Sequence, residues 1–115
     1  MFSRKNDLQA VVKAALHAVL PEVRRLADCS TAWLSHFGAV DIGAQYLFIF
    51  LVLPTRDQVA ACEASGAWNV IAEALRAALL RGGYPVENLT GQWFGVYSQQ
   101  ACDEEYNGNW YYFFK

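Results

Sequence analysis

The chain has 115 residues, of which 55% are hydrophobic and 17% charged, and its formal net charge is -2 at pH 7. This length and apolar content predict one domain over residues 1–115 with a single core, and they exclude an intrinsically disordered chain. The slightly acidic balance argues against the basic surface of a nucleic-acid binder, so we expect no nucleic-acid partner.

Residues 8–26 predict an amphipathic helix. Asn6 or Asp7 can cap its start, and the apolar residues that follow recur at spacings of three and four. Pro21 either kinks or ends this helix, or it begins a further turn that continues the same apolar stripe.

The same segment bears on the compartment. Lys13 and His17 interrupt its apolar residues, which is atypical of a signal peptide. The longest apolar run, 46–53, is far shorter than the roughly 20 residues of a membrane helix. The cysteines show no C-x-x-C spacing and are odd in number; they are Cys29, Cys62 and Cys102. We therefore expect a cytoplasmic protein with reduced thiols and no membrane contact.

Two strands are predicted next. Residues 31–37 alternate between two side-chain sets, and a loop with two glycines follows at 38–44. Residues 45–53 are apolar on both faces. Such a strand lies centrally and is covered on both sides, or it is covered on one side and meets a partner on the other.

Two helical segments follow Pro54. Thr55 and Gln58 match the capping-box spacing, which predicts a short helix. Ser65-Gly66 marks a break, and a second apolar stripe then runs over 68–79 until Gly82-Gly83 ends it.

The last third of the chain predicts a hairpin. Residues 92–98 alternate, residues 110–114 are all aromatic, and the polar segment 99–109 lies between them as an exposed loop. The full order α-β-β-α(α)-β-β predicts an α+β fold, in which an antiparallel sheet of about four strands carries its helices on one face.

Motifs for catalysis and cofactors are absent from the sequence. Neither G-x-x-x-x-G-K-[ST] nor G-x-G-x-x-G occurs, and two histidines with no ligand spacing predict no metal site. Cys29, His36 and Asp41 are the one grouping with nucleophile, base and acid, and a structural role for each is the simpler interpretation. We expect no catalytic residue, no cofactor and no enzymatic activity.

The tail combines aromatic and acidic residues, and two interpretations stay open. The rings either fill the core beneath the helices, or one face of the hairpin presents them to a protein partner beside an acidic rim. The candidate partner-binding residues are Trp93, Tyr97, Asp103, Glu104, Glu105, Tyr106 and Trp110.

A short acidic α+β chain with this tail, from Asp103-Glu104-Glu105-Tyr106 to the aromatic ending 110–114, resembles the immunity proteins of bacterial polymorphic and contact-dependent toxin systems. The resemblance covers size, charge and coarse element order. It implies a bacterial protein that neutralises a toxin, often a basic nuclease, by covering its active site. Because these immunity proteins share no sequence motif, the resemblance does not identify functional residues in this chain.

Two alternatives to this protein-binding module remain. One is a small dimeric chaperone or scaffold for a secreted effector, in which the strand 45–53 forms a dimer or client groove, so a monomer and a homodimer are both open. The other is a small-ligand-binding domain whose pocket uses Trp33, His36, Tyr46 and Trp93.

Overall fold

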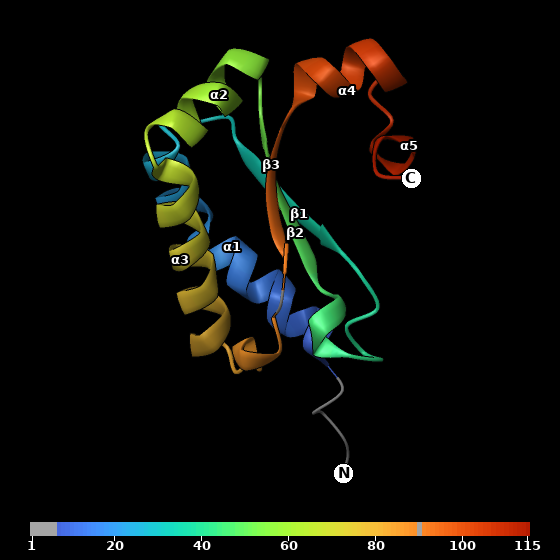
Figure 1. The fold of residues 1–115 in the computed structure, drawn as a ribbon. Coiled ribbons are helices and arrows are strands. Elements are labelled where there is room, and N and C mark those ends of the chain that lie inside the picture. Colours follow the sequence, from blue (N-terminus) through green and yellow to red (C-terminus); the bar gives the residue numbers. More distant parts are fainter. Residues whose placement is uncertain (1–6, 90) are drawn as a thin grey trace.

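The computed structural model describes residues 7–89 and 91–115, and Figure 1 shows the order of its elements. The helices are α1 (Leu8–Leu26), α2 (Arg56–Ala64), α3 (Ala67–Arg81), α4 (Gln99–Tyr106) and α5 (Trp110–Phe113). The strands are β1 (Trp33–Phe37), β2 (Phe48–Leu53) and β3 (Phe94–Ser98). Two short 3-10 turns, η2 (Ala44–Tyr46) and η3 (Val86–Asn88), precede β2 and β3.

The three strands form one mixed sheet in the order β1-β2-β3. β1 runs antiparallel to β2, with Ser35 opposite Phe50, and β3 runs parallel to β2, with Gly95 on the other side of Phe50. The connection explains the direction of β3. Because α2 and α3 carry the chain back along the sheet after β2, the next strand starts at the same end as β2 did.

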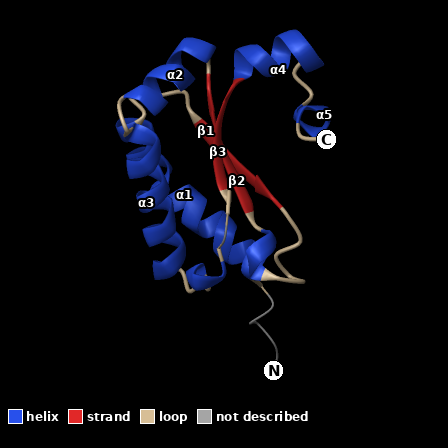
Figure 2. Cartoon of the chain, in the orientation of Figure 1, coloured by secondary structure: helices blue, strands red, loops and turns tan. Residues whose placement is uncertain are grey.

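The α+β class is therefore confirmed, but the predicted sheet is wrong. The antiparallel four-stranded arrangement and the order α-β-β-α(α)-β-β fail at the tail, where residues 99–106 and 110–113 are helical, so the fourth strand does not exist. The predicted single helical face also holds only in part: α1 and α3 lie on one side of the sheet, whereas α5 lies on the other (Figures 1 and 2).

α1 follows the predicted stripe. Val12, Leu16, Val19 and Val23 are buried, while the opposite side of the helix is exposed. Pro21 lies inside the helix, which continues to Leu26, so the helix does not end at this proline and the buried stripe continues at Val23. Over residues 7–89 and 91–115, no helix combines the length and apolarity that crossing a membrane requires.

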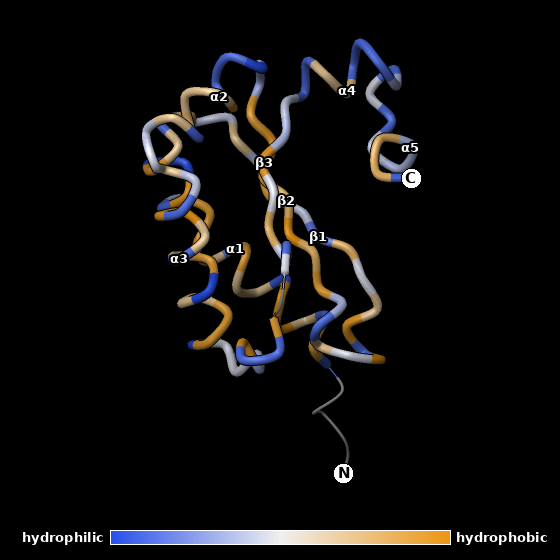
Figure 3. Tube along the Cα trace, viewed as in Figure 1, coloured by the Kyte–Doolittle hydropathy of each residue, from blue (hydrophilic) through white to orange (hydrophobic). Residues whose placement is uncertain are grey.

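The main core lies between the sheet and the pair α1 and α3. Ile49, Leu51 and Leu53 of β2 are at most 1% exposed and belong to one buried cluster with Ile71 and Leu75 of α3. Figure 3 shows this as hydrophobic colouring along β2 and α3. The alternate residues Phe50 and Val52 are also buried, although they point to the other face. β2 is thus central and covered on both sides, the first of the two predicted alternatives.

Local signals place α2 and β2. The capping box is present, since the Thr55 hydroxyl accepts a bond from the Gln58 backbone N–H at 3.2 Å and the Thr55 backbone N–H donates to the Gln58 side-chain oxygen at 3.1 Å. At the other end of the sheet, Gly38 has φ +117°, and a Cβ there would lie 1.9 Å from the Tyr46 carbonyl oxygen. Only glycine permits this approach between the chain after β1 and the chain before β2.

Tyr84 connects the two loops at that end. Its side chain is 1% exposed, and its hydroxyl donates a 2.7 Å hydrogen bond to the Ala44 carbonyl. Burial raises the pKa of Tyr84 to about 12. The neutral hydroxyl is therefore favoured in the folded chain, and it fixes η2 against the segment after α3.

We predict that Tyr84→Phe lowers the free energy of unfolding by about 1–2 kcal/mol at pH 7, because the Ala44 carbonyl loses its buried partner. An unfolded tyrosine ionises near pH 10, below the folded value for Tyr84. The wild-type advantage is thus complete below pH 10 and is lost as the pH rises towards 12. Urea unfolding between pH 7 and 11 tests this, with the exposed Tyr111→Phe as the matched control. A difference in unfolding free energy between the wild type and Tyr84→Phe that stays the same from pH 7 to 11 would contradict this prediction.

Candidate functional site

The face of the sheet opposite α1 and α3 carries a layer of aromatic rings. Successive side chains of a strand point to opposite faces, so the residues paired or alternating with Phe50 share its face. The rings that meet there are Trp33, Phe37, Phe48, Phe50 and Tyr97. This second apolar face needs its own cover, which the helices α1 and α3 cannot supply.

The tail supplies that cover. After β3 the chain forms α4 and then turns back, so that α5 faces the sheet (Figure 1). The ring centroid of Phe114 lies 4.7 Å from that of Phe50 and 5.0 Å from that of Tyr97. Trp110 meets Trp33 edge-on at 5.7 Å. Aromatic pairs at these distances and angles are favourable, so α5 is held by side-chain packing on β1, β2 and β3.

Capping residues shape the turn between α4 and α5. The Ser98 hydroxyl accepts the backbone N–H of Ala101 at 3.0 Å and begins α4 at the end of β3. Asn107 ends α4 in the left-handed region with φ 53°. The Asn109 side chain then accepts the N–H of Tyr112 at 3.2 Å and begins α5. These are ordinary helix start and stop signals, and they redirect the chain over a few residues.

Arg56 attaches α4 to the first turn of α2. Its guanidinium lies 2.6 Å from Glu104 and 3.0 Å from Glu105, and its backbone N–H donates to the Gln100 side chain at 3.0 Å. The hydrogen bond from Arg56, followed by its charge, lowers the pKa of Glu104. All three charged side chains stay about half exposed, so the pairs fix the orientation of α4 more than they stabilise the fold.

The seven predicted partner-binding residues do not form one surface. Tyr97 and Trp110 are partly buried within the aromatic layer. Trp93 packs against the helical core on the other side and meets Phe94. The rest lie on α4 and are exposed; they are Asp103, Glu104, Glu105 and Tyr106. The predicted exposed loop that was to hold them is helical.

Tyr111 and Tyr112, the two most exposed rings of the tail, were missed by the sequence analysis, whereas Tyr106 was among its predicted residues. Tyr111 and Tyr112 on α5 are 69% and 56% exposed, and Tyr106 on α4 is 39% exposed. Trp110 of α5 contacts Phe50 and Phe113 contacts Tyr97, both on the sheet. The two residues between them therefore point to solvent. Asn107-Gly108-Asn109 was the available signal, because a helix stop followed by a capping residue predicts a new helix.

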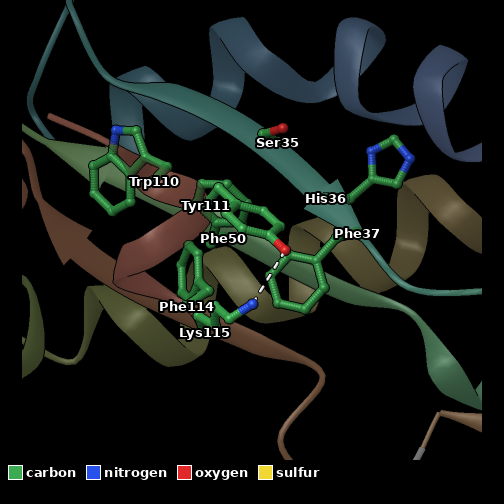
Figure 4. A pocket seen from close by; sticks show the side chains of 8 residues that line it. All are labelled: Ser35, His36, Phe37, Phe50, Trp110, Tyr111, Phe114 and Lys115. Carbon is green, nitrogen blue, oxygen red and sulfur yellow. Dashed lines mark hydrogen bonds between the residues drawn. The ribbon is translucent and has the colours of Figure 1, made fainter. Parts of the chain in front are cut away.

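A groove opens between β1 and α5, with a volume of about 430 Å³ (Figure 4). Ser35 is the small residue between the large side chains of Trp33 and Phe37 on this face, and its size leaves the space open. The side chains around the groove are Ser35, His36, Phe37, Phe50, Trp110, Tyr111, Phe114 and Lys115. The Lys115 ammonium donates to the Tyr111 hydroxyl at 3.3 Å at its rim.

This groove differs from the predicted ligand pocket. His36 lines it, but Tyr46 does not, and Trp33 lies beside a smaller hollow near Pro54 and Gln99. The four residues proposed as a pocket lining therefore do not converge on one cavity, and Trp93 belongs to the opposite side of the sheet.

The titratable groups of the chain are spread out. Cys29 meets Gln58 near the end of α1, whereas His36 meets Gln9 near its start, so the two side chains lie towards opposite ends of that helix. Burial raises the pKa of the Cys62 and Cys102 thiols, which keeps both protonated. In the described part of the chain, no three potential ligands gather into a metal site.

Known proteins offer no guide to this geometry. No protein-family model, no curated protein and no solved structure matches the chain. Its function therefore has to be inferred from its own residues.

We predict that Trp110→Ala lowers the free energy of unfolding by about 2 kcal/mol, because it removes the ring that meets both Trp33 and Phe50. Tyr112→Ala, on the exposed side of the same helix, should change it by less than about 0.5 kcal/mol. Urea denaturation measures both. Equal effects of the two substitutions would show that α5 does not dock on the sheet by this side.

Proposed function

We propose that the chain is a non-enzymatic protein-binding module whose contact surface is the outer side of α4 and α5. The observation that carries this proposal is the orientation of α5, which docks by Trp110 and leaves Tyr111 and Tyr112 in water. Tyrosine is enriched at protein interfaces, where its ring supplies contact area and its hydroxyl a hydrogen bond. Tyr106 extends the same tail surface onto α4.

The charge of this surface favours a basic partner. Asp103, Glu104 and Glu105 are all exposed on α4, and Arg56 pairs with Glu104 and Glu105. Three carboxylates against one guanidinium leave an acidic excess. Such an excess beside aromatic anchors speeds the encounter with a positively charged protein and orients it.

The sharpest form of the proposal is the role of an immunity protein, in which the chain binds and blocks a toxin inside the bacterial cytoplasm. The acidic excess next to three accessible tyrosines supports it, because a basic active-site cleft offers the complementary surface. A rigid tail held by Arg56 and the aromatic layer would present these groups without a large ordering cost.

A second candidate function is small-ligand binding in the groove between β1 and α5. Its volume of about 430 Å³ and its aromatic walls favour this alternative. The dimeric chaperone gains no such support from β2, since both faces of that strand are covered by the chain itself.

The test uses the protein encoded directly upstream of this chain. We predict a complex with a dissociation constant below about 1 µM, from which Tyr111→Ser/Tyr112→Ser dissociates at least tenfold faster. Ile42→Ser is the matched control, because Ile42 is 83% exposed but lies in the loop between β1 and β2. Biolayer interferometry gives the rates, and circular dichroism checks the fold of each variant.

Growth protection distinguishes the immunity role from binding in general. Co-expression of the chain should rescue cells that express the upstream protein, and the double tyrosine variant should not. Absence of a complex at about 10 µM would contradict the proposal, as would equal dissociation rates of the double variant and the Ile42→Ser control.

We predict a separate effect of charge. Asp103→Asn/Glu104→Gln/Glu105→Gln should lower the association rate with the upstream protein about tenfold at low salt and much less at high salt. The dissociation rate should change little, because all three side chains are exposed. Stopped-flow association at two ionic strengths tests this. An association rate that changes neither with the substitutions nor with the salt concentration would rule out electrostatic steering by α4.

A further inference from the structure

β1 is the accessible edge of the sheet. All of its residues are at least partly exposed, whereas β3, at the other edge, is buried except for Tyr97. Apart from its pairing with β2, the backbone of β1 makes no hydrogen bond to any other residue in the ranges 7–89 and 91–115. In an antiparallel ladder, every second residue of an edge strand turns its N–H and C=O outward. These outward groups are free to pair.

The usual protections of a free edge are missing here. Natural edge strands carry charged side chains, prolines or a covering element, which prevent the addition of another strand. β1 has no proline and no Lys, Arg, Asp or Glu. Burial, followed by the charge of Lys13, lowers the pKa of His36, so this side chain is neutral at pH 7. Nothing in the side chains of β1 repels a neighbouring strand.

Two hollows flank this edge, one on each face of the sheet. The first is the groove of about 430 Å³ between β1 and α5 (Figure 4), and the second, of about 340 Å³, lies between β1 and α1. Ser35 and His36 line both. Because alternate side chains of a strand point to opposite faces, a strand added beside β1 would direct its side chains into the two hollows in turn.

The walls of the hollows define the side chains they accept. The groove is aromatic, with Phe37, Phe50 and Phe114, and fits an aromatic ring. In the hollow beside α1, Lys13 and His17 lie among the apolar side chains of Leu16, Leu20 and Leu34. No acidic residue lines either space. A carboxylate on a short apolar stem therefore complements the second hollow.

We propose that the edge of β1 binds an extended peptide segment by strand addition, and that this segment alternates an aromatic side chain with acidic ones. The aromatic residue pairs with Ser35 and enters the groove next to α5. Its two acidic neighbours, opposite Leu34 and His36, point towards Lys13 and His17. Tyr111 lines the groove and also belongs to the outer side of α5. Ser35, Lys13 and His17 lie outside that surface, so either proposal can fail alone.

The probe is the labelled peptide acetyl-Gly-Ser-Glu-Phe-Glu-Ser-Gly-amide, with fluorescence anisotropy measured on the full chain at low ionic strength. Replacement of Phe by Ser, or of both Glu by Lys, should weaken binding at least about tenfold. N-methylation should weaken binding only when it falls on one of the two alternating sets of peptide residues, because only one set turns its N–H to β1. The proposal would be overturned if N-methylation of either set weakened binding equally, or if the Phe and Glu replacements left the affinity unchanged.

Variants of the chain locate the site. Ser35→Trp fills the groove and Lys13→Glu reverses the charge beside α1, and each should weaken the peptide at least about tenfold. Arg81→Glu makes the same charge change on α3, outside both hollows, and should leave binding within about twofold. A matching loss in Arg81→Glu would overturn the proposal. If Ser35→Trp does not fold, the N-methylated peptides and Lys13→Glu decide the outcome.

Other occupants of the edge give distinct results. A second copy of the chain would produce a dimer at about 50 µM that Ser35→Trp dissociates in sedimentation velocity. A small aromatic ligand would let N-acetyl-phenylalanine amide displace the labelled peptide as well as the unlabelled peptide does. Either result would overturn strand addition by a peptide, whereas a monomer and weak displacement are expected.

Discussion

The contact of Trp110 and Phe114 with Phe50 determines which side chains of the tail are exposed to solvent. A three-stranded sheet has two faces, and α1 and α3 cover one of them. The other face is aromatic and would expose a large apolar area without α5. By docking there, the tail completes a third layer, turns Tyr111 and Tyr112 outward, and forms one wall of the groove beside β1. Both proposed binding surfaces therefore depend on this contact.

Most of the fold before β3 follows from local patterns in the sequence. The stripe of α1, the capping box at Thr55 and the two-sided apolar run of β2 each predict the observed element. The direction of β3 does not follow in the same way, because alternation alone does not distinguish a parallel from an antiparallel neighbour. The length of the α2–α3 crossover is the feature that sets it.

The tail shows where propensity misleads. Five consecutive aromatic residues at 110–114 favour a strand intrinsically, yet most of them are helical, because Asn109 caps a turn and the sheet supplies an aromatic surface for them. For the candidate site, the sequence therefore predicted the types of residue involved, aromatic and acidic, but not their arrangement. The acidic residues and Tyr106 are exposed on α4, in a segment that the sequence analysis expected to be a loop, and the separation of Trp93 from them depends on contacts distant in sequence.

A double-mutant cycle between Phe50→Leu and Phe114→Leu measures the central contact most directly, since each change removes a ring while keeping an apolar side chain. We expect a coupling energy of about 1 kcal/mol in urea denaturation, because the rings lie 4.7 Å apart at their centroids. The pair Ile71→Val and Phe114→Leu, on opposite sides of the sheet, should couple by less than about 0.5 kcal/mol. No coupling between Phe50 and Phe114 would contradict the docking of the tail and both surfaces that depend on it.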